Sequence, residues 1–418
     1  MAERAGCGDF DPNSLPAEEA LRRMRAAVKA VTGAETVALS DAFRRVAAAD
    51  ITAAAPVPNS RNAAMDGYAV NALDLPAGGA CTLRIKGTAA AGHPFTGVLQ
   101  RGQCARIMTG APLPAGADTV VMQEAATVNV GAAAVTIGAG QRRNQFVREV
   151  GGDFNAGDTI LSAGDFIDAA ALGVLAAAGA ASVRVVRKPR VAFFSTGDEL
   201  RAVDQPLAAG ELHDSNRHTL GAMLRALAVE AADFGIVRDD PAATGRALGD
   251  AAASADAVIA TGGASVGDAD YVRRMLGEMG RVHFWKIAMK PGRPLSFGEI
   301  GGALFFGLPG NPVSVMVTFR QFVLPALRRL MGLREAAPLR ISARLAAPLQ
   351  KIPGRLEFQR GILALEKNGE YTVRTTGSQD SAVLSSMRKA NCYIVLPPAQ
   401  GDTAAGAAVT VEPFGVWI

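Results

Sequence analysis

Between Pro189 and Met331 the chain alternates short apolar runs with amphipathic segments, and no other feature constrains the fold as strongly. Continuous apolar runs such as Val191–Ser195 and Ala257–Thr261 are typical of strands buried on both faces. The expected order is strand 191–195, helix 219–231, strand 234–237, helix 242–253, strand 257–261, helix 271–278, strand 282–287, strand 303–307 and helix 312–331. Strands that alternate with helices predict a doubly wound α/β fold with a parallel or mixed sheet.

Short β-branched runs separated by glycine and proline lie on both sides of this stretch. The runs from Thr82 to Ile137 predict a small inserted β module, and those after Pro338 predict a C-terminal β-barrel. A length of 418 residues corresponds to about three domains of ordinary size. We expect a helical connector (14–54 and 145–187), an inserted β module (55–144), an α/β domain (188–333) and a C-terminal β-barrel (336–418).

Composition excludes several classes of protein. The chain is 49% hydrophobic and 20% charged, which is globular, and it has no stretch of 18 apolar residues, so we expect no membrane span. The chain has 43 Lys and Arg residues and 39 Asp and Glu residues, and it contains no run of basic residues. We therefore expect no nucleic-acid partner. The four cysteines lack metal-ligand spacing, and residues 1–10 lack an apolar signal segment. These features predict a cytoplasmic protein without disulfides.

Four polar or glycine-rich loops follow strands of the expected sheet. They are residues 196–200, 262–271, 290–294 and 308–314. Open α/β sheets bind ligands at the carboxyl ends of their strands, so we expect these loops to converge on one edge. The glycine-rich loop can bind a phosphate through its backbone N–H groups, although a purely structural turn is an alternative. No lysine follows it as in a P-loop, and no GxGxxG follows the first strand.

The same loops carry acids and bases. Asp268 and Asp270 are spaced to bind Mg²⁺ through oxygen, and Glu199 and Asp239 follow neighbouring strands. The alternative is that these acids only stabilise helix N-termini. Lys286, Lys290 and Arg293 favour an anionic substrate, with solvated surface cations as the alternative. Acids and bases at one edge indicate phosphoryl or nucleotidyl chemistry with a divalent metal.

Other motifs are less informative by themselves. Asp66 precedes a glycine, as in an ordinary turn. The four histidines lack zinc spacing, and no Ser/His/Asp or Cys/His signature is present.

In their joint order, the motifs resemble the molybdopterin molybdenumtransferases of molybdenum-cofactor synthesis, which are related to the gephyrin E domain. The resemblance runs from about residue 14 to 418. It is carried by Ala64-Met65-Asp66-Gly67-Tyr68-Ala69, Met108-Thr109-Gly110-Ala111-Pro112, Ser195-Thr196-Gly197-Asp198-Glu199-Leu200, Asp214-Ser215-Asn216, Gly262-Gly263-Ala264-Ser265-Val266-Gly267-Asp268-Ala269-Asp270-Tyr271, Lys290-Pro291-Gly292-Arg293-Pro294 and Gly307-Leu308-Pro309-Gly310-Asn311-Pro312-Val313-Ser314. The chain departs from the family at Gly151-Gly152-Asp153, where Gly-Glu-Asp is usual, and at Ala264, where valine is usual.

The resemblance implies an elongated homodimer in which the α/β domain holds adenylated molybdopterin and the partner subunit's β module closes the cleft. It implies insertion of molybdenum from molybdate with Mg²⁺-dependent release of AMP, downstream of a molybdopterin-adenylating enzyme. The alternatives are a molybdopterin adenylyltransferase and a non-catalytic scaffold on the same fold.

The resemblance also implies roles for particular residues. The implied catalytic residues are Asp66, Glu199, Asp239, Asp270, Lys286 and Lys290, of which Glu199, Asp239 and Asp270 bind the metal. The implied substrate-binding residues are Asp153, Thr196, Gly197, Asp198, Gly262, Gly263, Ser265, Gly267, Asp268, Arg293, Pro309, Asn311, Ser314, Arg355 or Arg360, and Ser381.

Overall fold

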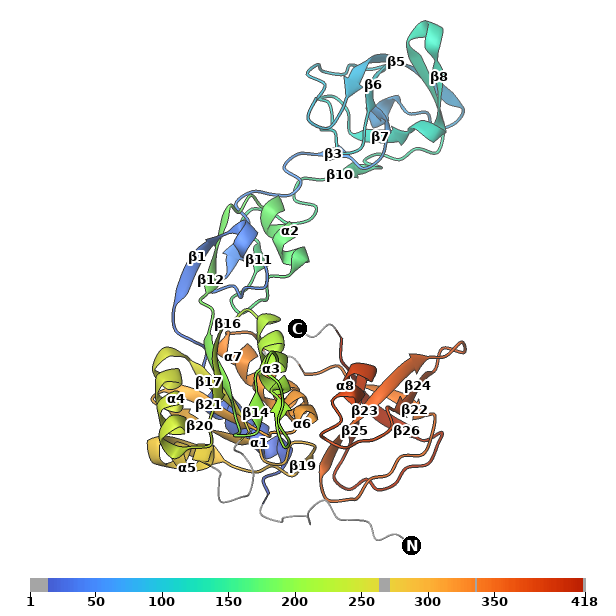
Figure 1. Cartoon of the computed structure of the whole chain (residues 1–418). Helices are drawn as coiled ribbons and strands as arrows, with labels where there is room; N and C mark the ends of the chain where they lie inside the picture. Colours follow the sequence, from blue (N-terminus) through green and yellow to red (C-terminus); the bar gives the residue numbers. More distant parts are fainter. Residues whose placement is uncertain (1–13, 263–270, 335–336, 416–418) are drawn as a thin grey trace.

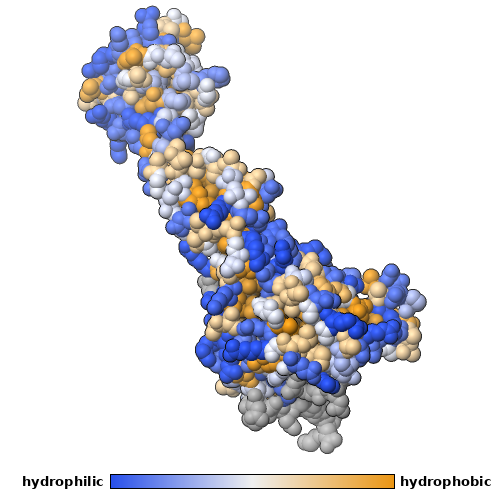
Figure 2. Space-filling model, turned by 90° about the vertical axis from the view of Figure 1, so that its left-hand side faces the viewer, coloured by the Kyte–Doolittle hydropathy of each residue, from blue (hydrophilic) through white to orange (hydrophobic). Residues whose placement is uncertain are grey.

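The computed structural model describes residues 14–262, 271–334 and 337–415. Figure 1 shows an elongated chain, with the β module at one end, the connector in the middle, and the α/β domain beside the C-terminal barrel at the other end. Hydrophilic residues are interspersed with apolar ones along the face seen in Figure 2. In the part of the chain that is described, no helix is long and apolar enough to cross a membrane.

The α/β domain is built on a six-stranded sheet of order β16-β13-β17-β21-β20-β18. The strands are β13 (Arg190–Thr196), β16 (Glu230–Val237), β17 (Ala257–Thr261), β18 (Gly280–Phe284), β20 (Ser296–Ile300) and β21 (Ala303–Leu308). β16, β13, β17 and β21 are parallel. β20 is antiparallel to both β21 and β18, so β18 runs in the same direction as the parallel strands.

Helices cover both faces of this sheet because successive side chains of its buried strands point to opposite sides. Val191 and Phe193 pack against α1 (Ala17–Ala27), α3 (Ser215–Arg225), α6 (Pro312–Thr318) and α7 (Leu324–Leu330). Ala192 and Phe194 pack against α4 (Pro241–Ser254) and α5 (Tyr271–Met279). The helix α1 precedes the connector in sequence but packs on this sheet.

Two expected helices differ from the structure, and one strand was not expected. Asp214 caps α3 by accepting a hydrogen bond from Arg217 N–H, so the helix begins at Ser215, and residues 230–231 belong to β16. The expected helix 312–331 is divided by a π-helical turn, Phe319–Val323, close to Pro325, whose missing N–H interrupts α-helical bonding. The strand β20 (Ser296–Ile300) is the one that was not expected.

The C-terminal domain is a closed five-stranded barrel. Its ring of strands is β23-β24-β22-β26-β25, and β25 pairs again with β23. The bounds are β22 (Ile341–Leu345), β23 (Leu356–Leu365), β24 (Tyr371–Thr375), β25 (Cys392–Leu396), β26 (Ala408–Pro413) and the helix α8 (Ser385–Lys389). The α/β domain adds one strand to it, because β19 (Met289–Lys290) pairs in parallel with the start of β23.

The connector consists of the helix α2 (Ala169–Ala177) and two-stranded ladders. The ladders are β1 (Ala34–Ala38) with β12 (Ser182–Val186), β2 (Ile51–Thr52) with β11 (Thr159–Leu161), and β3 (Asn62–Ala63) with β10 (Val147–Arg148). The module's sheet has the order β7-β4-β6-β5-β9-β8. Its strands are β4 (Gly67–Val70), β5 (Ala80–Ala89), β6 (Gln103–Ile107), β7 (Thr119–Met122), β8 (Ala126–Asn129) and β9 (Ala134–Gly138). The structure thus confirms the predicted fold class: an α/β domain, an inserted β module and a C-terminal barrel.

Candidate functional site

The predicted loops lie along the carboxyl edge of the α/β sheet, in an order set by the strands. Asp239 follows β16, Thr196 ends β13, Gly262 follows β17 and Asn311 follows β21. The segment that contains Lys286 and Lys290 connects β18 to β20 at the same edge. Neighbouring strands lie about 4.8 Å apart, so the acids at β13 and the bases before β20 are separated by about 14 Å along the edge. The edge is therefore acidic at one end and basic at the other.

Three carboxylates form the acidic end. Asp239 N–H donates a hydrogen bond to Asp198 Oδ1 at 3.3 Å, and the carboxylate of Glu199 lies over Gly197. Burial raises the pKa of Asp239, and the negative charges of Asp198 and Glu199 raise it further. Ionising Asp239 is therefore less favourable here than in water.

In the middle of the edge, the backbone of Gly262 lies close to the backbone of Thr196. Gly262 has φ +87°, and a Cβ there would stand 2.2 Å from the carbonyl oxygen of Thr196, so only glycine fits. The buried hydroxyl of Thr196 has no hydrogen-bond partner among the described residues. Buried polar atoms in proteins are almost always hydrogen-bonded, so this hydroxyl can form a hydrogen bond with a ligand at this edge. Gly263, Ser265, Gly267, Asp268 and Asp270, which were predicted from the same loop, lie outside the described residues.

Asn216 links three of the loops and was not among the predicted site residues. Its Nδ2 donates to Thr261 Oγ1 at 3.0 Å and to the carbonyl of Gly310 at 2.6 Å, and Thr261 Oγ1 donates to the carbonyl of Pro309 at 3.1 Å. The signal that could have identified it is the Asp214-Ser215-Asn216 motif at the start of α3. Asn216 therefore positions the loops after β17 and β21.

The basic end contains a buried carboxylate. Lys290 Nζ lies 3.3 Å from Oε1 of Glu357, which is only 4% exposed and also accepts a hydrogen bond from Gln359 Nε2 at 3.0 Å. The buried Lys351 donates to three backbone carbonyls, and burial lowers the pKa of its ammonium group. Lys286 and Arg293 lie half-buried in the same segment, whose turn is closed by Ile287 N–H donating to the Arg293 carbonyl at 3.0 Å.

The barrel contributes Ser381 to this end of the edge. Asn311 Nδ2 donates to Ser381 Oγ at 2.7 Å, and Val313 N–H donates to the Ser381 carbonyl at 3.1 Å. These two bonds join the loop after β21 to the barrel. Ser314, one residue further along α6, is buried with 4% exposure, so its side chain packs inside the domain.

Arg355 and Arg360, the two alternatives for the C-terminal substrate-binding arginine, have different surroundings. Arg360 is 1% exposed, and its guanidinium donates to Ser386 Oγ at 3.0 Å and to the carbonyls of Asp380 and Ser378 at 2.8 and 3.2 Å. Arg355 is half-buried and makes no hydrogen bond or ion pair with the residues that the structure describes. The guanidinium of Arg360 therefore stabilises the loop that contains Ser381. The guanidinium of Arg355 can instead bind an anion.

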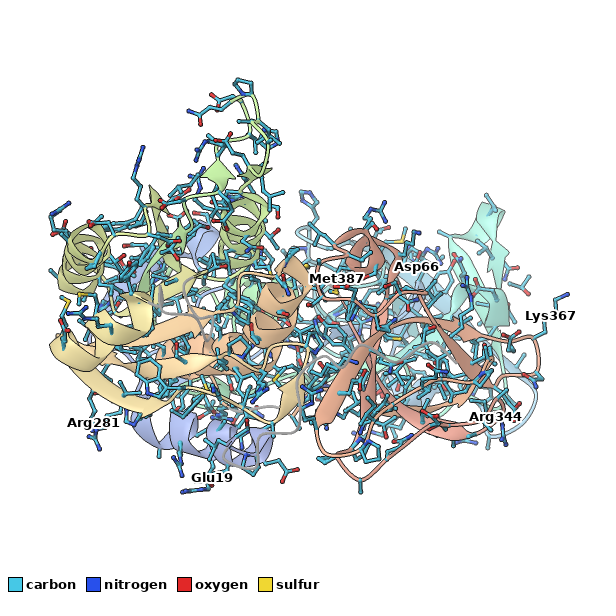
Figure 3. The ribbon with its side chains drawn as sticks, turned by 60° about the horizontal axis from the view of Figure 1, so that its bottom comes forward. Glu19, Asp66, Arg281, Arg344, Lys367 and Met387 are labelled. Carbon is cyan, nitrogen blue, oxygen red and sulfur yellow. The ribbon has the colours of Figure 1, made fainter. Side chains whose placement is uncertain are left out.

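Asp66 and Asp153 lie away from this edge. Asp66 belongs to the β module, where the N–H and the hydroxyl of Thr109 both donate to its Oδ1 at 2.7 Å. These bonds lower the pKa of Asp66. Its label overlaps the barrel in the view of Figure 3, but Figure 1 shows the module at the opposite end of the chain. Asp153 is exposed in the connector, between β10 and β11.

Comparison with known proteins matches three successive parts of the chain. Residues 15–179 match the MoeA N-terminal region, 192–329 a probable molybdopterin-binding domain, and 342–414 the MoeA C-terminal region. The chain is 40% identical to the molybdopterin molybdenumtransferase of Haemophilus influenzae over 401 residues, covering 96% of this chain and 98% of that one. It is 38% identical to the enzyme of that name from Nostoc, covering 90% of this chain and 88% of that one.

The fold comparison agrees with the sequence comparison. A crystal structure of the molybdopterin biosynthesis MoeA protein from Pyrococcus horikoshii matches with a TM-score of 0.82 at 26% identity, covering 96% of this chain and 100% of that one. Together with these matches, the motifs along the carboxyl edge show that the chain belongs to the molybdopterin molybdenumtransferase family.

Proposed function

We propose that this transferase inserts molybdenum from molybdate into adenylated molybdopterin and releases AMP with the help of Mg²⁺. The observation that carries the proposal is the division of the carboxyl edge into an acidic end and a basic end about 14 Å apart. An elongated ligand with anionic groups at separate positions matches this division. The relatives named molybdopterin molybdenumtransferase support the overall reaction.

The residues at the acidic end fit a magnesium ion. Mg²⁺ prefers oxygen ligands and is commonly bound by one or two carboxylates, with water and substrate phosphates as its remaining ligands. Burial, and then the charges of Asp198 and Glu199, raise the pKa of Asp239, and a bound cation would offset this cost of ionising it. Asp198, Glu199 and Asp239 are not arranged to enclose a metal ion by themselves, and the described residues contain no other group of three acids, histidines or cysteines that is. Glu199 and Asp239 would hold the ion, with Asp270 proposed as the third ligand, and the ion would neutralise charge on the phosphates.

The chain's own residues then orient the substrates. Gly262 brings backbone close to Thr196, whose hydroxyl is available to a phosphate oxygen. At the basic end Lys286, Lys290 and Arg355 would receive the molybdate dianion, and Ser381 would contribute its hydroxyl. Molybdate carries two negative charges, so a site with several cations favours its binding electrostatically.

The site is completed by a second subunit in this proposal. The β module of one chain lies far from its own carboxyl edge (Figure 1). The two hydrogen bonds from Thr109 lower the pKa of Asp66 and so favour its ionised form. In a homodimer related by a two-fold axis, the module of one subunit would cover the edge of the other and bring Asp66 to it. We propose a cytoplasmic dimer that receives its adenylated substrate from a separate molybdopterin-adenylating enzyme.

Product analysis tests the reaction. The full-length protein is incubated with adenylated molybdopterin, with and without molybdate and Mg²⁺, and AMP is quantified. We expect AMP release only when both are present. Consumption of ATP in the presence of free molybdopterin would instead identify an adenylyltransferase, and no turnover of either substrate would indicate a scaffold.

A further inference from the structure

A cavity of about 720 Å³ lies at the amino edge of the α/β sheet, opposite the candidate site. We call it the basal cavity; it is bounded by the C-terminal half of α1, the starts of β17 and β21, and the strands β18 and β20. Arg281 of β18 and Glu19 of α1 are both labelled along the lower edge of the α/β domain in the view of Figure 3. Ala26, Ala27, Ala30 and Gly302 line it, and their short side chains leave the space open.

The basal cavity carries an excess of positive charge. Its lining contains five basic residues, Arg22, Arg23, Lys29, Arg187 and Arg281, and two acidic ones, Asp256 and Glu299. Glu19, which pairs with both Arg22 and Arg23, adds a third carboxylate, so a net charge of +2 remains.

The excess charge resides on identifiable side chains. Arg187 is neutralised by two hydrogen bonds to Asp256, at 2.7 and 2.8 Å. Lys29 and Arg281 are exposed and form no ion pair with the described residues. Glu299, the register partner of Arg281, also lines the cavity and is hydrogen-bonded to His283. The net excess of two positive charges is therefore shared among Arg22, Arg23, Lys29 and Arg281, and it favours a dianion over a monoanion.

The cavity lining also includes the apolar side chains of Val31, Leu304 and Leu330. Binding sites for small molecules combine such apolar surface with a few charged groups that fix the ligand's orientation. The basal cavity therefore offers a place for a charged group and a place for an apolar or ring portion.

We propose that the basal cavity binds a small phosphorylated molecule with a ring portion, of which a nucleoside monophosphate is the simplest representative. Its phosphate would contact Lys29 and Arg281, and its ring would lie against Leu304 and Leu330. The cavity is at the opposite edge of the sheet from Glu199 and Lys290, so this site is separate from the one at which the transfer is proposed to occur.

The proposal is tested by titrating the full-length protein with AMP and with inorganic phosphate in a calorimeter. The test variant is Lys29→Ser/Arg281→Ser. The control is Lys86→Ser/Lys367→Ser, which removes the same charge from exposed positions outside the cavity lining. A third variant, Ala30→Trp, fills the cavity without changing its charge. Equal unfolding temperatures of the variants establish that each is folded.

We expect wild type and the control to bind one more AMP per chain than the test variant and Ala30→Trp do. If all four proteins bind the same number, wild type and the control should bind the AMP of this site at least about tenfold more tightly, because the test variant lacks the charge-assisted hydrogen bonds to the phosphate. AMP should bind this site more tightly than inorganic phosphate. Identical isotherms for the control and the test variant would overturn the proposal. Equal affinities for AMP and phosphate would overturn the assignment of a ring portion.

Discussion

Lys290 of the α/β domain forms an ion pair with Glu357 of the barrel, with 3.3 Å between Nζ and Oε1. The two residues are register partners in the parallel pairing of β19 with β23. Glu357 is buried and Lys290 is partly exposed, so the carboxylate holds the ammonium group at the edge of the candidate site. Glu357 is thus a positioning residue for Lys290.

We expect Glu357→Gln to lower kcat/KM chiefly by raising the KM for molybdate, because Lys290 loses the group that orients it. In a double-mutant cycle with Lys290→Ala, the two changes should be non-additive by about 0.5–3 kcal/mol. Glu370→Gln is a control, since it removes an acid from an exposed ion pair with Arg344 on the same barrel. Additive effects of the two substitutions would show that Glu357 does not act through Lys290.

Replacing the acids should abolish turnover without unfolding the protein. Glu199→Ala and Asp270→Ala are each expected to reduce kcat by at least about 10- to 100-fold at limiting Mg²⁺, because each removes a proposed metal ligand. Asp204→Ala, at an exposed acid in the segment after β14 (Leu200–Arg201) and before β15 (Leu212–His213), should retain normal activity. Near-normal turnover of both test variants would contradict the metal assignment.

The raised pKa of Asp239 predicts a pH-dependent cost to stability. A carboxyl group whose folded pKa lies above its unfolded value destabilises the fold when it is ionised, and the cost disappears as the pH falls through the folded pKa. Asp239→Asn should therefore raise the unfolding temperature at neutral pH in EDTA, and the gain should shrink at acidic pH. Excess Mg²⁺ should stabilise wild type more than the variant. An unchanged unfolding temperature at neutral pH would contradict the repulsion among the three acids.

The two barrel arginines should respond differently to alanine. Arg360→Ala removes a buried guanidinium and leaves the Ser386 hydroxyl and the carbonyls of Ser378 and Asp380 without this donor, so we expect a loss of about 3 kcal/mol of unfolding free energy. Arg355→Ala should unfold like wild type but require more molybdate for half-maximal activity. Urea denaturation and molybdate titration measure the two effects. A folded, fully stable Arg360→Ala variant would argue against the structural role of this side chain.

Subunit mixing tests whether Asp66 acts across the dimer. Asp66→Ala and Glu199→Ala chains are each expected to be inactive as homodimers. In a random mixture about half of the dimers are heterodimers, and each has one site that is intact at both positions, so about a quarter of wild-type activity should return. If activity does not return although subunit exchange has been verified, Asp66 acts in the site of its own subunit or serves only as a structural turn residue.

Much of the fold was predictable because its signals are local. The apolar runs of β13, β17 and β21 identify buried strands, and parallel strands place their following loops at one edge. β20 was missed because Gly298 and Glu299 interrupt its apolar pattern. The separation of acids from bases depends on the strand order, which no local pattern encodes. The role of Glu357 depends on closure of the barrel against Lys290, a contact between distant segments, so sequence spacing carried no signal for it.

The chain enters the β module at Ala63 and leaves it at Val147, and these two residues face each other in the pairing of β3 with β10. Both residues also belong to one of the module's hydrophobic clusters, in which Ala63 is fully buried and Val147 packs against it, so the stem and the module form one packed unit. Asp66 follows Ala63 by only three residues, so it lies at the stem end of the module. The direction in which the two stem strands leave the connector, rather than the length of the module, therefore sets where that carboxylate arrives.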